Sequence, residues 1–139
     1  MQIHEVMTPN PTAIRADRTI GDALAALDAA PIRHLPVLED GALIGILSDR
    51  SLKPWRSALL QAQKWGEGGV RKLLLDEPVA KHFERSVLFV GPEYDVREAI
   101  DLMLENRVGS LPVVGDAGKL IGIVTQVDLL RAMRDLLCS

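Results

Sequence analysis

The alternation of apolar and polar residues near the end of the chain predicts a buried strand that leads directly into an amphipathic helix. Residues 120–124 are an apolar run that ends at Thr125, and residues 126–137 carry apolar side chains at helical spacing. Thr125 falls at the N-cap and Asp128 at the third helical position, which is the arrangement of a capping box. A hydroxyl, a carboxylate and free backbone N–H groups therefore meet at one helix start. This suits a ligand with phosphate and ribose groups, and it also suits a helix start that binds nothing.

The same pattern occurs twice in the chain. The segment 45–48 (Gly-Ile-Leu-Ser) lies 77 residues before the segment 122–125, and the Leu-Pro-Val segments at 35–37 and 111–113 lie 76 residues apart. A duplication that keeps its register over about fifty residues is a strong signal, and two copies form an internal pair rather than a solenoid, which needs about three or more units. The one-residue slip falls in a turn, where insertions are tolerated.

Each copy predicts the order strand, helix, strand, strand, helix. In the first copy the predicted elements are strands at 12–15, 35–38 and 43–47 and helices at 19–30 and from Ser48 to about Lys64. In the second copy they are strands at 87–90, 111–114 and 119–124 and helices at 95–106 and 126–137. The predicted fold class is α+β (alpha-beta), with two units related by a pseudo-two-fold axis and each centred on its own small sheet. The predicted limits are 1–64 for repeat 1, 65–76 for a glycine-rich linker and 77–139 for repeat 2.

Several side chains have predicted structural roles within this fold. Four residues are predicted to form two further capping boxes, namely Thr19 with Asp22 and Asp95 with Glu98. Three long side chains are predicted to lie at core positions of their helices, namely Met103, Leu104 and Met133. Pro36 and Pro112 occupy matching strand positions. Because proline cannot donate to a sheet ladder, each is expected on an edge strand or at a strand start.

Composition and charge narrow the function classes. The chain has 139 residues, of which 47% are hydrophobic and 25% charged, as in a globular domain. Its net charge of −3 argues against a broad nucleic-acid surface. No apolar run approaches the ~20 residues that a membrane span needs, and the N-terminus has no signal-like segment. The single cysteine, Cys138, cannot form an internal disulfide, which indicates a reducing, cytoplasmic setting.

The residue types of common catalytic and metal sites do not gather in the sequence. His4-Glu5 resembles the start of a zinc-protease helix, but Thr8 stands where the second histidine would be. The three histidines and one cysteine show no metal-ligand spacing. No nucleophile is paired with a base in a supporting motif. The prediction is therefore that the protein is not an enzyme and holds no metal.

The ordered set of segments, present twice, resembles the cystathionine β-synthase (CBS) domain, and the tandem pair resembles a Bateman module. The opening segment 6–9 (Val-Met-Thr-Pro) is similar to the start of that domain, and the resemblance covers about residues 3 to 132. It implies two CBS folds that pack through their sheets, with two related ligand clefts between the repeats. It further implies a stand-alone regulatory module that binds an adenosine-containing ligand in such a cleft.

The resemblance also implies which residues bind the ligand. In the family, the hydroxyl and the carboxylate of a Thr-x-x-Asp pattern contact ligand phosphate and ribose, and these roles carry over to Thr125 and Asp128. In the first copy Ser48 matches the hydroxyl, but Ser51 stands where the aspartate would be. The Asp128 site is therefore expected to bind more tightly than the Ser51 site. The remaining predicted ligand-binding residues are Ile123, Arg33, His34, Pro36 and Pro112.

Ligand and partners stay open among several candidates. The adenosyl ligands considered are AMP, ADP, ATP and S-adenosylmethionine, none of them as a required cofactor. The module is expected to form a homodimer, because its helices carry more apolar positions than a small sheet covers, and to regulate an attached or separate enzyme or transporter. The alternative is a protein-interaction or dimerisation module with vestigial clefts. The sequence names neither the ligand nor the partner, and it does not settle whether Mg²⁺ takes part.

Overall fold

The computed structural model describes residues 1–66 and 68–139, which form two compact units. Unit 1 combines residues 1–11, 41–43 and 88–139, and unit 2 combines residues 12–40 and 44–87. The predicted linker 65–76 belongs to unit 2, apart from Glu67, which lies outside the described residues. Each unit is therefore assembled from segments that are distant in sequence.

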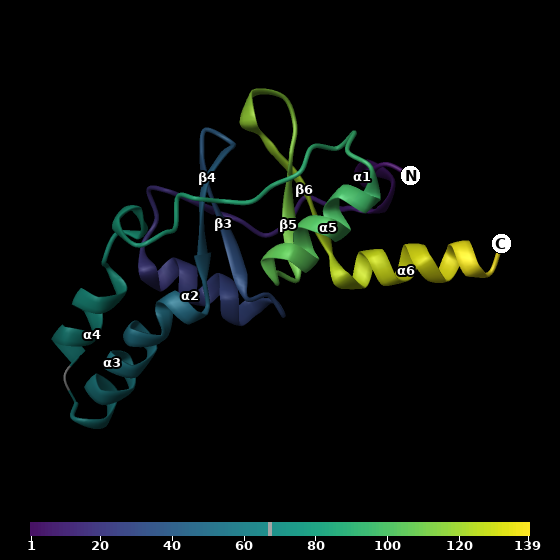
Figure 1. Ribbon diagram of the computed structural model, residues 1–139. Coiled ribbons are helices and arrows are strands. Elements are labelled where there is room, and N and C mark those ends of the chain that lie inside the picture. Colours follow the sequence, from purple (N-terminus) through teal and green to yellow (C-terminus); the bar gives the residue numbers. More distant parts are fainter. Residues whose placement is uncertain (67) are drawn as a thin grey trace. The chain divides into compact units, whose positions relative to one another are not determined.

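The elements of both units follow the predicted order closely (Figure 1). Unit 1 contains α1 (Ile3–Val6), β1 (Thr8–Pro9), α5 (Val96–Asn106), β5 (Ser110–Val114), η3 (Asp116–Gly118), β6 (Leu120–Thr125) and α6 (Gln126–Leu137). Unit 2 contains β2 (Ile14–Arg15), α2 (Ile20–Ala29), β3 (His34–Glu39), most of β4 (Ala42–Ser48), η1 (Arg50–Leu52), α3 (Lys53–Lys64), α4 (Gly68–Leu75) and η2 (Val79–Lys81). The predicted linker is thus largely helical.

Two separate three-stranded sheets organise the units. Their strand orders are β1-β6-β5 and β2-β3-β4. Equivalent residues pair in the two units, since Ile14 lies opposite Val37 and Val90 opposite Val113, both pairs in parallel. The predicted α+β class with one small sheet in each unit is therefore confirmed.

Each unit also contains the opening segment of the other repeat. Thr8 of β1 lies opposite Ile123 of β6, and Glu84 lies opposite Ile46 of β4. The segments approach closely because glycine lies beneath them: a Cβ at Gly122 would lie 2.6 Å from the Met7 sulfur. The predicted repeat limits 1–64 and 77–139 describe the duplication in sequence, whereas the compact units cut across them.

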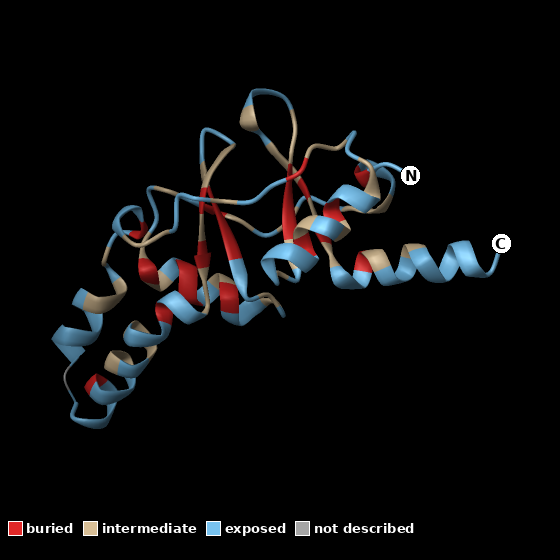
Figure 2. Cartoon of the chain, in the orientation of Figure 1, coloured by how far each residue is buried: buried red, intermediate tan, exposed pale blue. Residues whose placement is uncertain are grey.

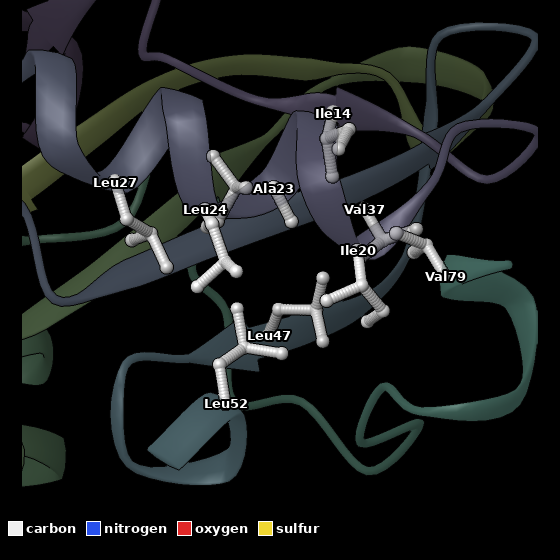
Figure 3. Packing of buried hydrophobic residues seen from close by; sticks show 10 residues of the cluster. Ile14, Ile20, Ala23, Leu24, Leu27, Val37, Leu47, Leu52 and Val79 are labelled. Carbon is white, nitrogen blue, oxygen red and sulfur yellow. The ribbon is translucent and has the colours of Figure 1, made fainter. Parts of the chain in front are cut away.

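Each unit has its own apolar core (Figure 2). The core of unit 2 lies between α2, the sheet and η1, where ten residues form one cluster (Figure 3): Ile14, Ile20, Ala23, Leu24, Leu27, Leu35, Val37, Leu47, Leu52 and Val79. The core of unit 1 contains Ile3, Val90, Ala99, Met103, Leu111, Val113 and Val124. Val79 and Ile3, which come from the exchanged opening segments, are fully buried. The opening segments therefore complete the cores.

Some local predictions are wrong. Residues 87–90 do not form a strand, and Val90 alone makes a bridge. Glu98 does not complete a capping box, although Asp95 does cap α5 by accepting a hydrogen bond from the Arg97 N–H. Leu104 is 73% exposed because the core face of α5 is set by Ala99 and Met103, one turn apart, and Leu104 lies about 100° around the helix.

α6 has little of its apolar surface buried. Asp128 is its one buried residue, and Met133 is 50% exposed, so the predicted core position of Met133 is wrong. The reason is that no other described element of unit 1 covers the outer turns of this helix, which carry five exposed apolar side chains: Val127, Leu130, Met133, Leu136 and Leu137.

The two strand prolines have different positions. Pro112 lies on β5, an edge strand, as expected. Pro36 lies on β3, the central strand of the other sheet, so the expectation of an edge is wrong for this residue. It is tolerated because β2 pairs with Val37 and Leu38, beginning just past the proline. No residue of β2 is therefore left without a hydrogen-bond donor by the N–H that Pro36 lacks.

Candidate ligand-binding site

The Thr125 and Asp128 side chains form one hydrogen-bonded cluster at the start of α6. Asp128 is only 6% exposed. Its Oδ2 accepts from the Thr125 N–H at 2.9 Å and from the Thr125 hydroxyl at 3.0 Å, and the Asp128 N–H donates to Thr125 Oγ1 at 3.2 Å. Its Oδ1 accepts from the Thr8 hydroxyl at 3.0 Å. The predicted capping box is therefore present, and a residue from the opening segment joins it.

These hydrogen bonds limit what the cluster can offer a ligand. The Thr125 hydroxyl donates its one proton to Asp128, so it can accept from a ligand but cannot donate to phosphate while the cap is formed. Both lone pairs of Asp128 Oδ2 are used within the cap. Oδ1 accepts one hydrogen bond, from Thr8, and the Arg131 guanidinium lies 3.8 Å from it, so one lone pair of Oδ1 remains for a further donor such as a ribose hydroxyl. The ligand roles of Thr125 and Asp128 stay predictions, and this geometry favours the ribose role over the phosphate role.

The other predicted residues of unit 1 share one face of its sheet with Thr125. Pro112 lies opposite Ile123, and Ser110 lies opposite Thr125. Directly opposed residues in an antiparallel pair point to the same side of the sheet, and so do residues two apart on one strand. The fold therefore brings Pro112, Ile123 and Thr125 together beside the helix start.

The helix start of unit 2 has the same backbone design with different side chains. The Ser51 N–H donates to Ser48 Oγ at 3.0 Å, and the Ser51 hydroxyl donates to the Ser48 carbonyl at 2.8 Å. The Asp49 N–H donates to the Arg33 carbonyl at 2.7 Å, just as the Gln126 N–H donates to the Gly109 carbonyl in unit 1. Ser51 is exposed, whereas Asp128 is buried. This start is consequently more open and carries no carboxylate at the third helical position.

The predicted basic residues of unit 2 lie at the beginning of β3. Arg33 and His34 are exposed, and Pro36 is buried. The backbone link from Arg33 to Asp49 places this end of β3 beside the Ser48 helix start. The fold therefore brings all five predicted residues of unit 2 to one end of its sheet, with the Arg33 and His34 side chains free to meet an anion.

Two residues near these sites were missed by sequence reasoning. The sequence assigned Thr8 no role at the site, although its hydroxyl contacts Asp128 across 120 residues of sequence. Arg56 forms ion pairs with Asp28 at 3.0 Å and Asp49 at 3.2 Å. The hydrogen bond from Arg56 to Asp28 is the main reason that the pKa of Arg56 is raised, so this guanidinium stays charged and engaged. Gly45 and Gly122 were the sequence signal that could have shown that another segment, such as the one with Thr8, lies against these strands.

Metal centres and membrane spans are two further classes of feature that a chain of this kind could carry. Within residues 1–66 and 68–139, no three histidine, cysteine or acidic side chains gather in a way that could hold a metal ion. None of the described helices is long and apolar enough to cross a membrane.

Comparison with known proteins gives consistent matches. The model of the CBS domain matches residues 3–55 and 79–135. A CBS domain-containing protein of Dictyostelium discoideum is 34% identical over 129 residues, covering 92% of this chain and 88% of that protein. An inosine-5'-monophosphate dehydrogenase of Methanocaldococcus jannaschii is 29% identical over 128 residues, but the match spans only 22% of that enzyme. The crystal structure of Arabidopsis thaliana CBSX2 in complex with AMP is 29% identical with a TM-score of 0.77, covering 97% of both chains.

Proposed function

Because the chain belongs to the CBS domain family, we propose that it is a regulatory CBS-pair module that binds an adenosine-containing ligand at its helix starts. The observation that carries this proposal is the pair of helix starts at Thr125 and Ser48. Each start bears a hydroxyl group and lies in the same unit as one copy of the repeated Leu-Pro-Val strand. The AMP complex of a protein similar over nearly the full chain supports the choice of ligand class. The candidates are AMP, ADP, ATP and S-adenosylmethionine.

Each helix start makes its own ligand contacts in this proposal. At the start of α6, Asp128 Oδ1 accepts from a ribose hydroxyl, while Ile123 and Pro112 supply an apolar surface for the adenine ring. At the Ser48 start, which leads into η1, the exposed Arg33 and His34 side chains contact the phosphate of a second ligand. The ribose role at the start of α6 follows from its hydrogen-bond capacity, because Thr125 has no free proton for an anion.

A ligand panel tests the proposal. Thermal unfolding is measured with AMP, ADP, ATP, S-adenosylmethionine and NAD. A ligand present at 100 times its Kd stabilises the folded state by ~2.7 kcal/mol, which amounts to roughly 5–10 °C for a domain of this size. A reproducible shift is expected with at least one adenosyl ligand, and none is expected with guanosine, the control that carries a different purine base. If none of these ligands raised the unfolding temperature, the result would count against ligand binding.

A second function is favoured by the surface of α6. Five apolar side chains of this helix are exposed, among them Leu130 at 65% and Leu136 at 60%. An apolar stripe of this kind fits a self-complementary contact between two copies. Homodimerisation is therefore part of the proposal, and a pure interaction module with vestigial ligand sites is the alternative that the absence of any such shift would favour.

The regulated partner and the location complete the proposal. In the archaeal dehydrogenase the matched region is a minor part of a longer protein, which supports a role beside an enzyme or transporter rather than catalysis by the module itself. A free, exposed Cys138 supports a reducing, cytoplasmic setting. Purification of the partner from cells with the protein as bait, with and without AMP, tests the regulatory role.

A further inference from the structure

At the two helix starts, the carboxylate and the hydroxyl group stand at opposite positions: one is on the helix and the other on the opening segment, and the two units have them the other way round. In unit 1 the opening segment supplies the Thr8 hydroxyl and the helix supplies the Asp128 carboxylate, joined by a 3.0 Å hydrogen bond. The equivalent positions of unit 2, at the spacing of the duplication, are Glu84 and Ser51. There the opening segment carries the carboxylate and the helix carries the hydroxyl. The acidic group that the first repeat lacks at Ser51 is therefore present on the facing segment.

The backbone places Glu84 where Thr8 stands in the other unit. Thr8 lies opposite Ile123 in the antiparallel pairing of β1 with β6. Glu84 lies opposite Ile46, and the two residues exchange both backbone hydrogen bonds at 2.9 Å. Opposed residues point to the same side of the sheet, and residues two apart on a strand do so as well. Glu84 and Ser48 therefore extend from the same side, as Thr8 and Thr125 do.

The carboxylate of Glu84 is accessible in a way that Asp128 is not. Glu84 is exposed, and it forms no ion pair with the other residues that the structure describes. The nearest basic neighbour in sequence, Arg85, lies over the Phe83 ring with its guanidinium carbon 4.6 Å from the ring centroid. Glutamate is longer than threonine, and this compensates for a serine that is shorter than aspartate. The Glu84 side chain can thus reach the region above Ser51.

We propose that Glu84 is the ribose-binding carboxylate of the first repeat and determines the specificity of that site for an intact ribose. This inference rests on the proposed adenosyl-binding function. A carboxylate without protein donors can accept hydrogen bonds from both vicinal hydroxyls of one ribose, one at each oxygen. The site at Ser48 therefore selects ligands with a 2'-hydroxyl, and it is not a vestige of a lost aspartate.

Isoleucine methyl NMR separates the two sites, because Ile46 and Ile123 occupy equivalent positions beside the two helix starts. AMP and 2'-deoxy-AMP are titrated into the wild-type protein, the Glu84→Gln variant and the Glu39→Gln variant. Glu39 is the matched control, since it is also exposed and lies at the other end of β3. Circular dichroism checks that all three proteins are folded.

The expected result is a loss of AMP affinity at Ile46 of about tenfold or more in Glu84→Gln, because hydrogen bonds to a charged group are lost. The signal of Ile123 and the Glu39→Gln control stay unchanged, and 2'-deoxy-AMP binds weakly at Ile46 whether or not Glu84 is present. Unchanged AMP affinity at Ile46 in Glu84→Gln, or binding reported by Ile123 alone, would overturn the inference and leave the proposed function intact. No shift at either isoleucine with any adenosyl ligand would overturn both.

A reciprocal exchange gives an independent test. Glu84→Thr alone is expected to weaken binding at Ile46, and addition of Ser51→Asp to this variant is expected to restore it, because the pair then matches Thr8 and Asp128. Ser51→Asp alone places two carboxylates face to face, so its affinity is expected to stay below that of the double variant. A double variant that binds no more tightly than Glu84→Thr would overturn the assignment.

Discussion

The replacement of Asp128 by alanine separates the structural role of this carboxylate from its predicted ligand role. The variant removes an acceptor from three donors, namely the Thr125 N–H, the Thr125 hydroxyl and the Thr8 hydroxyl. Loss of a helix cap costs ~1 kcal/mol, and donors left unsatisfied at a buried site cost a further ~1–3 kcal/mol. The nearby Arg131, at 3.8 Å and 59% exposed, adds little, since exposed ion pairs contribute ~0–1 kcal/mol. The expected loss is therefore about 2–4 kcal/mol.

Urea unfolding followed by far-ultraviolet circular dichroism measures this loss. A domain has about 5–15 kcal/mol of stability in total, so the variant stays folded in water with a lower transition midpoint. Ser51→Ala is the matched control in the other unit, and it is expected to lose no more than ~1 kcal/mol because Ser51 is an exposed, uncharged cap. Equal midpoints for Asp128→Ala and wild type would refute the view that Thr8 and Thr125 depend on this carboxylate.

The Asp128→Asn variant then tests the ligand role. Asparagine keeps one acceptor oxygen for Thr8 or Thr125 but loses the charge, so its stability is expected to lie between those of wild type and Asp128→Ala. Its AMP affinity at the Ile123 site is expected to fall about tenfold or more, since hydrogen bonds to a charged acceptor contribute ~1.5–3 kcal/mol. A stable Asp128→Asn protein that binds AMP like wild type would show that this carboxylate is a cap alone.

Three further outcomes follow from the packing. Gly45→Ala is expected to lower the free energy of unfolding in urea by ~1–3 kcal/mol, because the new Cβ would collide with the Phe83 ring. Gly69→Ala is the control, since there is open space around Gly69, and it is expected to be neutral or stabilising. Equal effects of the two substitutions would contradict this packing argument. Leu130→Gln is expected to shift the mass measured by light scattering from that of the proposed dimer toward that of the 15.2 kDa chain. A dimer mass that stays unchanged in this variant would contradict a role of α6 in the contact. The Arg97 backbone N–H donates to Asp95 and lowers the pKa of that carboxyl. The stability difference between wild type and Asp95→Ala is therefore expected to be complete above about pH 4 and to vanish as the pH falls through the lowered pKa. A difference that persists in strong acid would contradict this.

Features set by neighbours in sequence were predictable from the sequence alone. The capping boxes at Thr19 and Thr125 are present because each depends on residues three apart, and residues 126–137 form α6 over the predicted bounds. The duplication also predicted equivalent strands and two small sheets, because two segments with the same pattern of apolar and polar residues bury the same faces and form the same elements. The predicted strand at 87–90 failed because its apolar residues lack a partner strand except at Val90.

Features set by contacts between distant segments required the tertiary structure. The periodicity of α5 does not show that Leu104 points away from the sheet, because a shift of about 100° in helix orientation leaves the pattern almost unchanged. Likewise, neither the hydrogen bond from Thr8 to Asp128 nor the pairing of Glu84 with Ile46 follows from spacing along the chain. Both arise because each opening segment pairs with the sheet of the other repeat, and long-range strand pairing is decided by the packing of the whole unit. The sequence therefore determined which residue types stand at the two helix starts, and the tertiary structure alone decided that Thr8 pairs opposite Ile123 and Glu84 opposite Ile46.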